Sequence, residues 1–384
     1  MEPVSASEGT AIQRDEKGFA AMTTMTRRSL VRGAAAILAA PAALRATSAW
    51  AAGADARIGQ LLMLGFYGDA PDARSAKALA AHMKAGRVGG AVFLRHNVAS
   101  RQGVEALTAM FHGTGTRPLL SIDQEGGKVQ RLGEKHGYTD IPEAGRVSAR
   151  YSPNEARALY ARAGEELRRS GFNVNLAPAI DLHDPDNPVI GRYERAYGTD
   201  PKTVAIYGQA FIDGFSRAGV SCVAKHFPGH GTSRGDSHDG FVNITRTWRD
   251  AELEPFRALA ATAPMVMGGH LVHDGLTGST PVTFSKELLE GTLRGRLGFT
   301  GAIMTDDLDM GAIRQNYSVR DAVVRSVAAG NDIVLMSNSA EPDSDLAAKA
   351  VAWIKQAVGD GEIAPGRVDE AHARVMRIKE QVAL

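Results

Sequence analysis

Short apolar runs rich in β-branched residues recur along the chain from Arg57 onward. Most of these runs are apolar at every position, as expected of parallel strands that are covered by helices. The eight runs are residues 61–66, 90–94, 118–123, 172–178, 220–226, 265–271, 302–306 and 332–337.

Segments with the helical spacing of apolar residues lie between these runs, at residues 75–85, 154–170, 201–218, 248–263, 286–297 and 319–329. Several end at a glycine, where a left-handed residue closes a helix: Gly86, Gly171, Gly219 and Gly330. Strands and helices that alternate in this way predict an α/β protein with a single (β/α)₈ TIM-type barrel. A doubly wound open sheet is the alternative. A nucleotide-binding sheet of that kind requires a glycine-rich loop after the first strand, and residues 64–68 match such a loop poorly.

The first 51 residues have the features of an export signal. Arg27 and Arg28 precede an Ala/Leu-rich stretch at residues 33–44, and Ala49-Trp50-Ala51 has the small-x-small form of a signal peptidase site. Paired arginines indicate the twin-arginine route. We therefore expect the twin-arginine translocase as a partner during export, and a periplasmic or secreted mature protein.

A membrane anchor or a first helix of the domain is the alternative for this region. The apolar stretch is shorter than the roughly 20 residues that span a bilayer, and Pro41 interrupts it. Residues 1–21 are acidic for a signal start, so Met22 and Met25 are candidate initiators and residues 1–21 would then not be translated. The folded barrel is expected at residues 52–384.

Net charge and cysteine content exclude several classes of protein. A formal net charge of +1 gives no field that would gather nucleic acid or an anionic membrane. Cys222 is the only cysteine, so the chain forms neither an intrachain disulfide nor a thiolate metal cluster. Because it lies in an apolar run, we expect a buried, inert thiol.

Polar residues follow the C-terminal ends of six of the predicted strands. In a barrel these ends open on one mouth, where catalytic groups gather. An apolar strand that ends in an ionisable residue would bury an unpaired charge unless that residue faced a cleft. The residues concerned are Asp123, Asp181 and His183, Lys225 and His226, His270, Asp306 and Asp307, and Ser337 and Asn338.

The loop after the third strand runs from Asp123 to Arg131. Gly126 and Gly127 let its backbone approach a ligand closely. Asp123 supplies an acceptor and Arg131 a forked donor, and both suit sugar hydroxyls. The alternative is a solvated loop with an internal salt bridge.

The loop after the fifth strand contains several histidines. His226 and His230 have the i, i+4 spacing of a zinc-binding helix, but Pro228-Gly229 lies between them and the glutamate base of that motif is missing. Further along, Asp236 and His238 form a candidate carboxylate–imidazole pair in which the aspartate fixes the tautomer for proton transfer. Taken alone, an exposed loop histidine near an aspartate is equally consistent with a pair that has no function.

Asp306 ends the seventh strand, where a rigid element would hold its carboxylate. Attack on a sugar's anomeric carbon needs such a carboxylate and a separate acid to protonate the departing oxygen. We expect Asp307 and Asp309 to cap and orient the helix that follows.

These residues together resemble glycoside hydrolase family 3, in its single-domain β-N-acetylhexosaminidase branch. The resemblance covers about residues 57–376. It rests on residues 58–63, on Asp123-Gln124-Glu125-Gly126-Gly127 through Arg131, on Lys225-His226-Phe227-Pro228-Gly229-His230-Gly231, on Asp236-Ser237-His238, and on Thr305-Asp306-Asp307-Leu308.

The resemblance implies that Asp306 is the nucleophile and that His238, supported by Asp236, is the general acid/base. It also implies that the N-acetylglucosamine ring is held by Asp123, Arg131, Arg195, Lys225 and His226. In the family pattern one residue separates Val-Ile-Gly from the arginine, whereas here Arg192-Tyr193-Glu194 follows Val189-Ile190-Gly191. Arg195 is preferred because Ala-Tyr-Gly follows it, and Arg192 stays an alternative.

The implied activity is that of a retaining exo-β-N-acetylglucosaminidase, a monomer without cofactor or metal. Its substrates would be peptidoglycan fragments or chitooligosaccharides. Three alternatives stay open. Phosphate can compete with water because a neutral histidine brings no negative charge near the acceptor, which gives a phosphorolytic enzyme. The others are a metal-dependent barrel hydrolase, which would use His226, His230, His238, His270 and Asp306, and a non-catalytic sugar-binding protein.

Overall fold

The computed structural model describes residues 53–382, so the export signal predicted at residues 1–51 lies outside the described residues. Eight parallel strands form one sheet in the order β11-β9-β7-β6-β3-β2-β1-β12. Each strand coincides with one of the predicted apolar runs, and the predicted barrel is confirmed. The strands are β1 (Leu62–Leu64), β2 (Gly90–Phe93), β3 (Leu119–Ile122), β6 (Val174–Asn175), β7 (Ser221–Phe227), β9 (Met265–Gly268), β11 (Ala302–Thr305) and β12 (Val334–Met336).

The barrel closes between β11 and β12, through a parallel bridge that pairs Met304 with Ile333. The amide of Thr305 donates to the carbonyl of Ile333 at 3.0 Å. Side chains supply further bonds across this seam. The Thr305 hydroxyl accepts the amide of Leu335 at 2.9 Å, and the Asp307 carboxylate accepts the amide of Ser337 at 2.8 Å.

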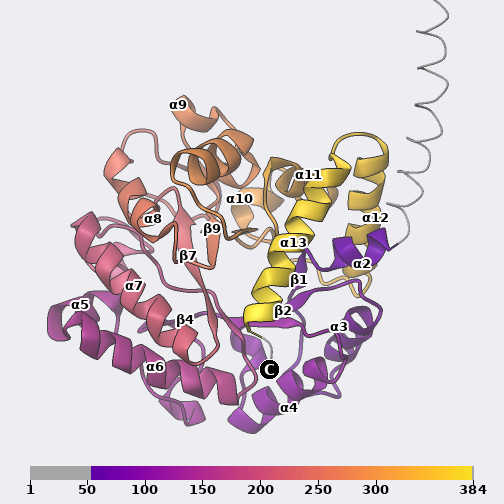
Figure 1. Cartoon of the computed structure of the whole chain (residues 1–384), viewed down its shortest axis with the longest axis horizontal. Coiled ribbons are helices and arrows are strands. Elements are labelled where there is room, and N and C mark those ends of the chain that lie inside the picture. The colour runs from indigo at the N-terminus through magenta and orange to yellow at the C-terminus, as the bar shows by residue number, and fades with distance from the viewer. Residues whose placement is uncertain (1–52, 383–384) are drawn as a thin grey trace, which may run out of the picture. The chain divides into compact units, whose positions relative to one another are not determined.

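Helices surround the strands (Figure 1). The glycines predicted to end four of them, Gly86, Gly171, Gly219 and Gly330, all have positive φ. The helices are α2 (Ala54–Gly59), α3 (Arg74–Lys84), α4 (Arg101–His112), α5 (Ala144–Arg150), α6 (Pro153–Arg169), α7 (Pro201–Arg217), α8 (Glu254–Leu259), α9 (Asp274–Thr277), α10 (Gly311–Arg314), α11 (Val319–Ala329), α12 (Leu346–Gly359) and α13 (Pro365–Gln381).

Two predicted helices differ from expectation. The segment predicted at residues 286–297 is a π-helix, η6 (Glu287–Arg296), and the one at 248–263 divides into a 3₁₀ turn, η4 (Asp250–Leu253), followed by α8. The remaining short elements are η1 (Arg95–Asn97), η2 (Glu134–His136), η3 (Gly191–Tyr193), η5 (Val282–Phe284), and two strand pairs: β4 (Gln124–Gly126) with β5 (Val129–Gln130), and β8 (Val242–Asn243) with β10 (Leu271–Val272).

Side chains from all eight strands fill the barrel, and α13 covers its N-terminal end. Met63, Val174 and Met304 belong to this core, and Val375 and Ile378 of α13 pack against the same cluster. Burying a large aliphatic side chain contributes about 1.5–3 kcal/mol. This packing closes the N-terminal end of the barrel.

A buried ion cluster ties α13 and η6 to the start of β12. Asp332 is fully buried and accepts hydrogen bonds from Arg294 at 2.6 Å, from Arg374 at 3.1 Å and from Arg367. It also accepts the amide of Ile303 in β11 at 2.9 Å. One carboxylate therefore joins the closing strands to two outer helices.

Two sequence expectations concern burial and membranes. Cys222 is free and buried, as predicted, and burial raises the pKa of its thiol.

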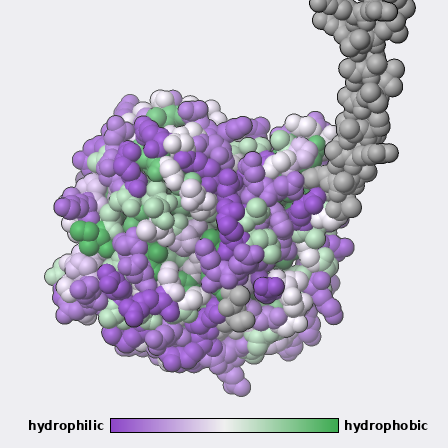
Figure 2. All heavy atoms as spheres, in the orientation of Figure 1, coloured by the Kyte–Doolittle hydropathy of each residue, from purple (hydrophilic) through white to green (hydrophobic). Residues whose placement is uncertain are grey.

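Within the described part of the chain, no helix combines the length and apolar character of a membrane span. Hydrophilic side chains dominate the molecular face drawn in Figure 2.

The ion cluster predicts a specific loss of stability. Asp332→Ala leaves three arginines near the barrel floor without their shared carboxylate, and we expect a free energy of unfolding lower by about 3–5 kcal/mol. Glu362→Ala removes the partner of Arg320 in an exposed pair, and this control should cost less than about 1 kcal/mol. Urea unfolding followed by circular dichroism measures both. Equal stabilities of the two variants would contradict the role given to Asp332.

Candidate active site

The C-terminal ends of the strands surround a cavity of about 180 Å³. This volume is below the roughly 300–1,000 Å³ of drug-sized ligand sites, and it suits a single sugar ring. The structure brings into its lining the residues that the family resemblance assigned to the site: Asp123, Arg131, Arg195, Lys225, His226, Asp236, His238 and Asp306. Among the other strand-end residues, Asp181, His183, His270 and Asn338 do not line it.

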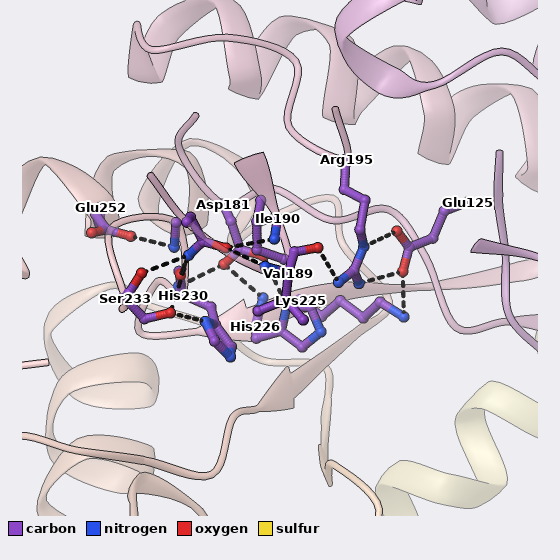
Figure 3. Close-up of polar contacts among 12 residues, drawn as sticks. Glu125, Asp181, Val189, Ile190, Arg195, Lys225, His226, His230, Ser233 and Glu252 are labelled. Atoms are coloured by element: carbon purple, nitrogen blue, oxygen red, sulfur yellow. Dashed lines mark hydrogen bonds and ion pairs between the residues drawn. The ribbon is translucent and has the colours of Figure 1, made fainter. Parts of the chain in front are cut away.

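A network of alternating charges lines the cavity, and Figure 3 shows its members Glu125, Arg195 and Lys225. Lys225 Nζ lies 2.9 Å from a carboxylate oxygen of Asp123 and 2.8 Å from one of Glu125. Arg195 meets Glu125 in a forked contact, with both nitrogen–oxygen distances at 2.8 Å. Arg131 lies 3.1 Å from Asp123. The predicted internal salt bridge thus exists, but it lines the cavity.

These contacts favour the charged forms of Asp123, Glu125 and Lys225. Burial opposes ionisation of Asp123 and Glu125, but Lys225 and the arginines outweigh it, so the pKa of Asp123 lies below its ordinary value and that of Glu125 falls to about 2. Burial likewise opposes protonation of Lys225, and the two carboxylates overcome this and raise its pKa. Fixed donors and acceptors of this kind can read the hydroxyls of a sugar without reorganising.

The structure distinguishes the two candidate arginines. Arg195 lines the cavity and is 12% exposed in its side chain. Arg192 is exposed, and its guanidinium lies 5.5 Å from the centre of the Tyr193 ring. The geometry therefore favours Arg195 as the sugar-binding arginine.

Asp181 orients His226 from behind the cavity. Its carboxylate lies 2.8 Å from His226 Nδ1 and accepts the backbone amides of His226 at 3.2 Å and His230 at 2.7 Å. Burial disfavours the charged form of Asp181, but these two histidines outweigh burial and lower its pKa. With Nδ1 committed to Asp181, Nε2 of His226 is left for a ligand.

His230 has the predicted spacing from His226, and a neighbouring hydroxyl holds its ring. Its Nδ1 lies 2.7 Å from the Ser233 hydroxyl, and burial, with His226 next, lowers its pKa to about 4. It is therefore a neutral imidazole near neutral pH. Across residues 53–382, no group of three histidine, cysteine, aspartate or glutamate residues is arranged to hold a metal ion. The arrangement gives the metal-dependent alternative no support.

Asp306 is held rigidly at the end of β11. Its amide donates to the carbonyl of Gly268 in β9 at 3.1 Å, and its carboxylate accepts the amide of Asp307 at 2.8 Å. Burial disfavours its ionisation, but the imidazoles of His270 and His226 outweigh burial and lower its pKa. Asp306 is therefore a carboxylate at neutral pH, as a nucleophile must be.

The predicted capping role of Asp307 and Asp309 is wrong. The N-cap of α10 is Met310, without a side-chain bond. Asp307 instead accepts the amide of Ser337 at 2.8 Å, and Asp309 accepts the amide of Ser339 at 2.8 Å. Both carboxylates tie the turn after β11 to the chain that follows β12. Burial raises the pKa of Asp307 to about 6.

The expected Asp236–His238 pair is present. His238 Nδ1 lies 2.7 Å from Asp236 Oδ1, and the same oxygen accepts the His238 amide at 2.9 Å. Burial opposes ionisation of Asp236, but these two bonds outweigh burial and lower its pKa. The His238 side chain is 71% exposed, so its Nε2 is accessible to a substrate that enters the cavity. That it transfers a proton stays a prediction.

Sequence reasoning missed three acidic residues of the site. Glu125 lies in the motif from Asp123 to Arg131, but only Asp123 and Arg131 were predicted to bind the sugar. Asp181 was recognised as a polar residue after a strand, but no role was predicted for it. Glu252 is buried and accepts the Gly231 amide at 3.1 Å and the Thr232 hydroxyl. Burial raises its pKa to about 7. Its position within the helix predicted at residues 248–263 carried no signal of contact with the loop after β7.

Comparisons with known proteins agree with this architecture. The family model "Glycosyl hydrolase family 3 N terminal domain" matches residues 54–378. The chain is 39% identical over 285 residues to the beta-hexosaminidase LpqI of Mycobacterium tuberculosis, covering 71% of each chain. It is 37% identical over 274 residues to a beta-hexosaminidase of Xylella fastidiosa, covering 68% of this chain and 80% of the relative.

Solved structures give the same result. A glycoside hydrolase family 3 beta-N-acetylglucosaminidase from a Paenibacillus species matches with a TM-score of 0.78 and 34% identity, over 86% of this chain and 62% of that chain. A beta-N-acetylhexosaminidase from Beutenbergia cavernae matches with a TM-score of 0.75 and 34% identity, over 85% of this chain and 98% of that chain. This chain belongs to glycosyl hydrolase family 3 and is a glycoside hydrolase.

Proposed function

We propose that the protein is a retaining exo-β-N-acetylglucosaminidase that removes a terminal, non-reducing, β-linked N-acetylglucosamine. One observation carries the proposal. The ionised carboxylate of Asp306 and the Asp236–His238 pair line the same small cavity. The names of the relatives from Mycobacterium tuberculosis and Beutenbergia cavernae support the choice of sugar.

In the first step the carboxylate of Asp306 attacks the anomeric carbon while His238 donates a proton to the glycosidic oxygen. The bond to the departing sugar breaks and a covalent glycosyl-enzyme forms. Asp236 accepts from Nδ1 of His238, which fixes Nε2 as the atom that faces the leaving group and stabilises the imidazolium.

In the second step neutral His238 takes a proton from water, and the resulting nucleophile displaces Asp306 from the anomeric carbon. Two inversions leave the β configuration unchanged. The charged wall of Asp123, Glu125, Lys225 and Arg195 holds the ring hydroxyls in place through both steps. The cavity of about 180 Å³ suits one ring, which favours attack at a chain end.

The sequence features of residues 1–51 support export by the twin-arginine route and action outside the cytoplasm. Peptidoglycan fragments in the periplasm or chitooligosaccharides outside the cell are then the substrates that the protein would meet. We propose that it acts on them as a monomer.

Replacing the nucleophile tests the first step. We expect Asp306→Asn to lower kcat for an aryl N-acetylglucosaminide by roughly 10³-fold or more, because the amide cannot form the glycosyl ester. Asp309→Asn changes a carboxylate three residues further on that bonds Ser339, and we expect a loss below about tenfold. Near-normal turnover by Asp306→Asn would refute the assignment.

The acid/base pair has a different signature. Asp236→Ala should lower kcat/KM for an unactivated disaccharide by about 10²-fold or more, because proton donation is lost. A dinitrophenyl leaving group departs without protonation, so its kcat/KM should change little. The pH profile for the disaccharide should also shift, since Asp236 is ionised at neutral pH in the wild type. Equal losses of kcat/KM on both substrates, with an unchanged pH profile, would refute the acid/base role of Asp236 and His238.

Product analysis separates hydrolysis from the alternatives. We expect free N-acetylglucosamine from chitooligosaccharides or muropeptides, with and without phosphate, and unchanged rates with a chelator. A sugar 1-phosphate formed in phosphate buffer would show phosphorolysis instead. Loss of activity with the chelator would indicate a metal-dependent enzyme.

A further inference from the structure

The loop between β7 and β8, residues 228–241, carries the acid/base pair and is here called the acid/base loop. Its first half is buried against the barrel. The Gly231 amide and the Thr232 hydroxyl donate to the buried carboxylate of Glu252. The second half carries His238, whose side chain is 71% exposed. The position of the imidazole therefore depends on what holds this outer half.

The outer half of the acid/base loop contacts the start of α10, and we call this the α10 contact. Two of its bonds go from amides of the first helical turn to loop carbonyls, and the third comes from a side chain. They run from Gly311 N to His238 O at 3.1 Å, from Ala312 N to Ser237 O at 3.2 Å, and from Gln315 Nε2 to Asp239 O at 3.0 Å.

The α10 contact links the two reacting groups mechanically. Gly311 is the fifth residue after Asp306, and the turn between them is tied to the chain after β12 by the bond from Ser337 N to Asp307. The segment that fixes the nucleophile therefore also fixes the backbone of His238. Double displacement requires these groups on opposite sides of one anomeric carbon, so an error of about 1 Å in either position is costly.

Position 311 requires glycine because the backbone of the acid/base loop lies too close for a side chain, and not because of its φ angle. A Cβ atom there would lie 2.4 Å from His238 O and 3.2 Å from the carbonyl carbon of Asp239. The φ angle of Gly311 is not positive, so the helical backbone at this position accepts an alanine. The substitution would therefore displace the loop backbone and leave α10 intact.

We propose that Gly311 and Gln315 are positioning residues that place His238 over the glycosidic oxygen through the α10 contact. The inference rests on the proposed function, because it takes His238 as the acid/base. Neither residue needs to touch the substrate. Their loss leaves the nucleophile and the sugar-binding wall in place and weakens proton transfer alone.

The test uses the dependence of kcat/KM on the leaving group. For Gly311→Ala we expect a loss of about 100-fold with chitobiose, whose leaving group needs a proton, and less than about threefold with the dinitrophenyl glycoside. Gln315→Leu removes one bond and should show the same pattern with a smaller loss. Gly366→Ala in α13 is the matched control, because that helical glycine has open space around it, and it should match the wild type on both substrates.

Asp236→Ala, measured in parallel, separates this proposal from the proposed function. If Asp236→Ala shows the leaving-group dependence while Gly311→Ala and Gln315→Leu match the wild type on chitobiose, the positioning role is refuted. Equal losses of the two variants on both substrates would also refute it, since they would indicate general damage to the site. If Asp236→Ala itself lacks the dependence, the acid/base assignment fails first.

Discussion

Closure of the barrel between β11 and β12 is the constraint on which the site depends. Parallel strands that close on themselves bring all their C-terminal ends to one rim. At this seam one bridge pairs Met304 with Ile333, the amide of Leu308 donates to the carbonyl of Leu335 at 3.0 Å, and side chains carry part of the pairing. Three side chains accept backbone amides across the seam, in order from the N-terminal to the C-terminal ends of the strands. Asp332 accepts the amide of Ile303, Thr305 that of Leu335, and Asp307 that of Ser337. The proposed nucleophile lies between the last two.

The charged wall opposite the seam follows from the same closure. Asp123 and Lys225 are 102 positions apart in sequence, yet their side chains meet at 2.9 Å. Buried charges are stabilised only when they are paired and hydrogen-bonded, and Lys225 satisfies two carboxylates at once. A sugar hydroxyl that enters this wall finds donors and acceptors already fixed. Because binding then requires little reorganisation, the interactions can be strongest in the transition state.

The sequence predicted much of this arrangement because its signals are local. Apolar runs located the eight strands of the parallel sheet, and ionisable residues at strand ends located the rim, including Asp306. Physical reasoning alone left Asp236 and His238 undecided, since a pair on an exposed loop has no local signature, and the motif around it was needed. The structure then showed the contact between them at 2.7 Å.

What the sequence did not predict depends on contacts between distant segments. Glu252 supports the acid/base loop from another element, and Asp181 orients His226 across 45 positions. The cap expected at Asp307 was wrong because Ser337, a partner from the neighbouring strand, competes for its carboxylate. The segment predicted as an α-helix at residues 286–297 is the π-helix η6, and because i→i+5 helices are rare, a helical apolar pattern is assigned to an α-helix.

The most direct test of the account is to trap the glycosyl-enzyme. A 5-fluoro-N-acetylglucosaminyl fluoride slows the second step, and digestion followed by mass spectrometry locates the attached sugar. Double displacement through Asp306 predicts one equivalent of sugar on the peptide that contains Asp306, released as the enzyme recovers activity. Sugar attached to another residue, or turnover without any covalent intermediate, would contradict it.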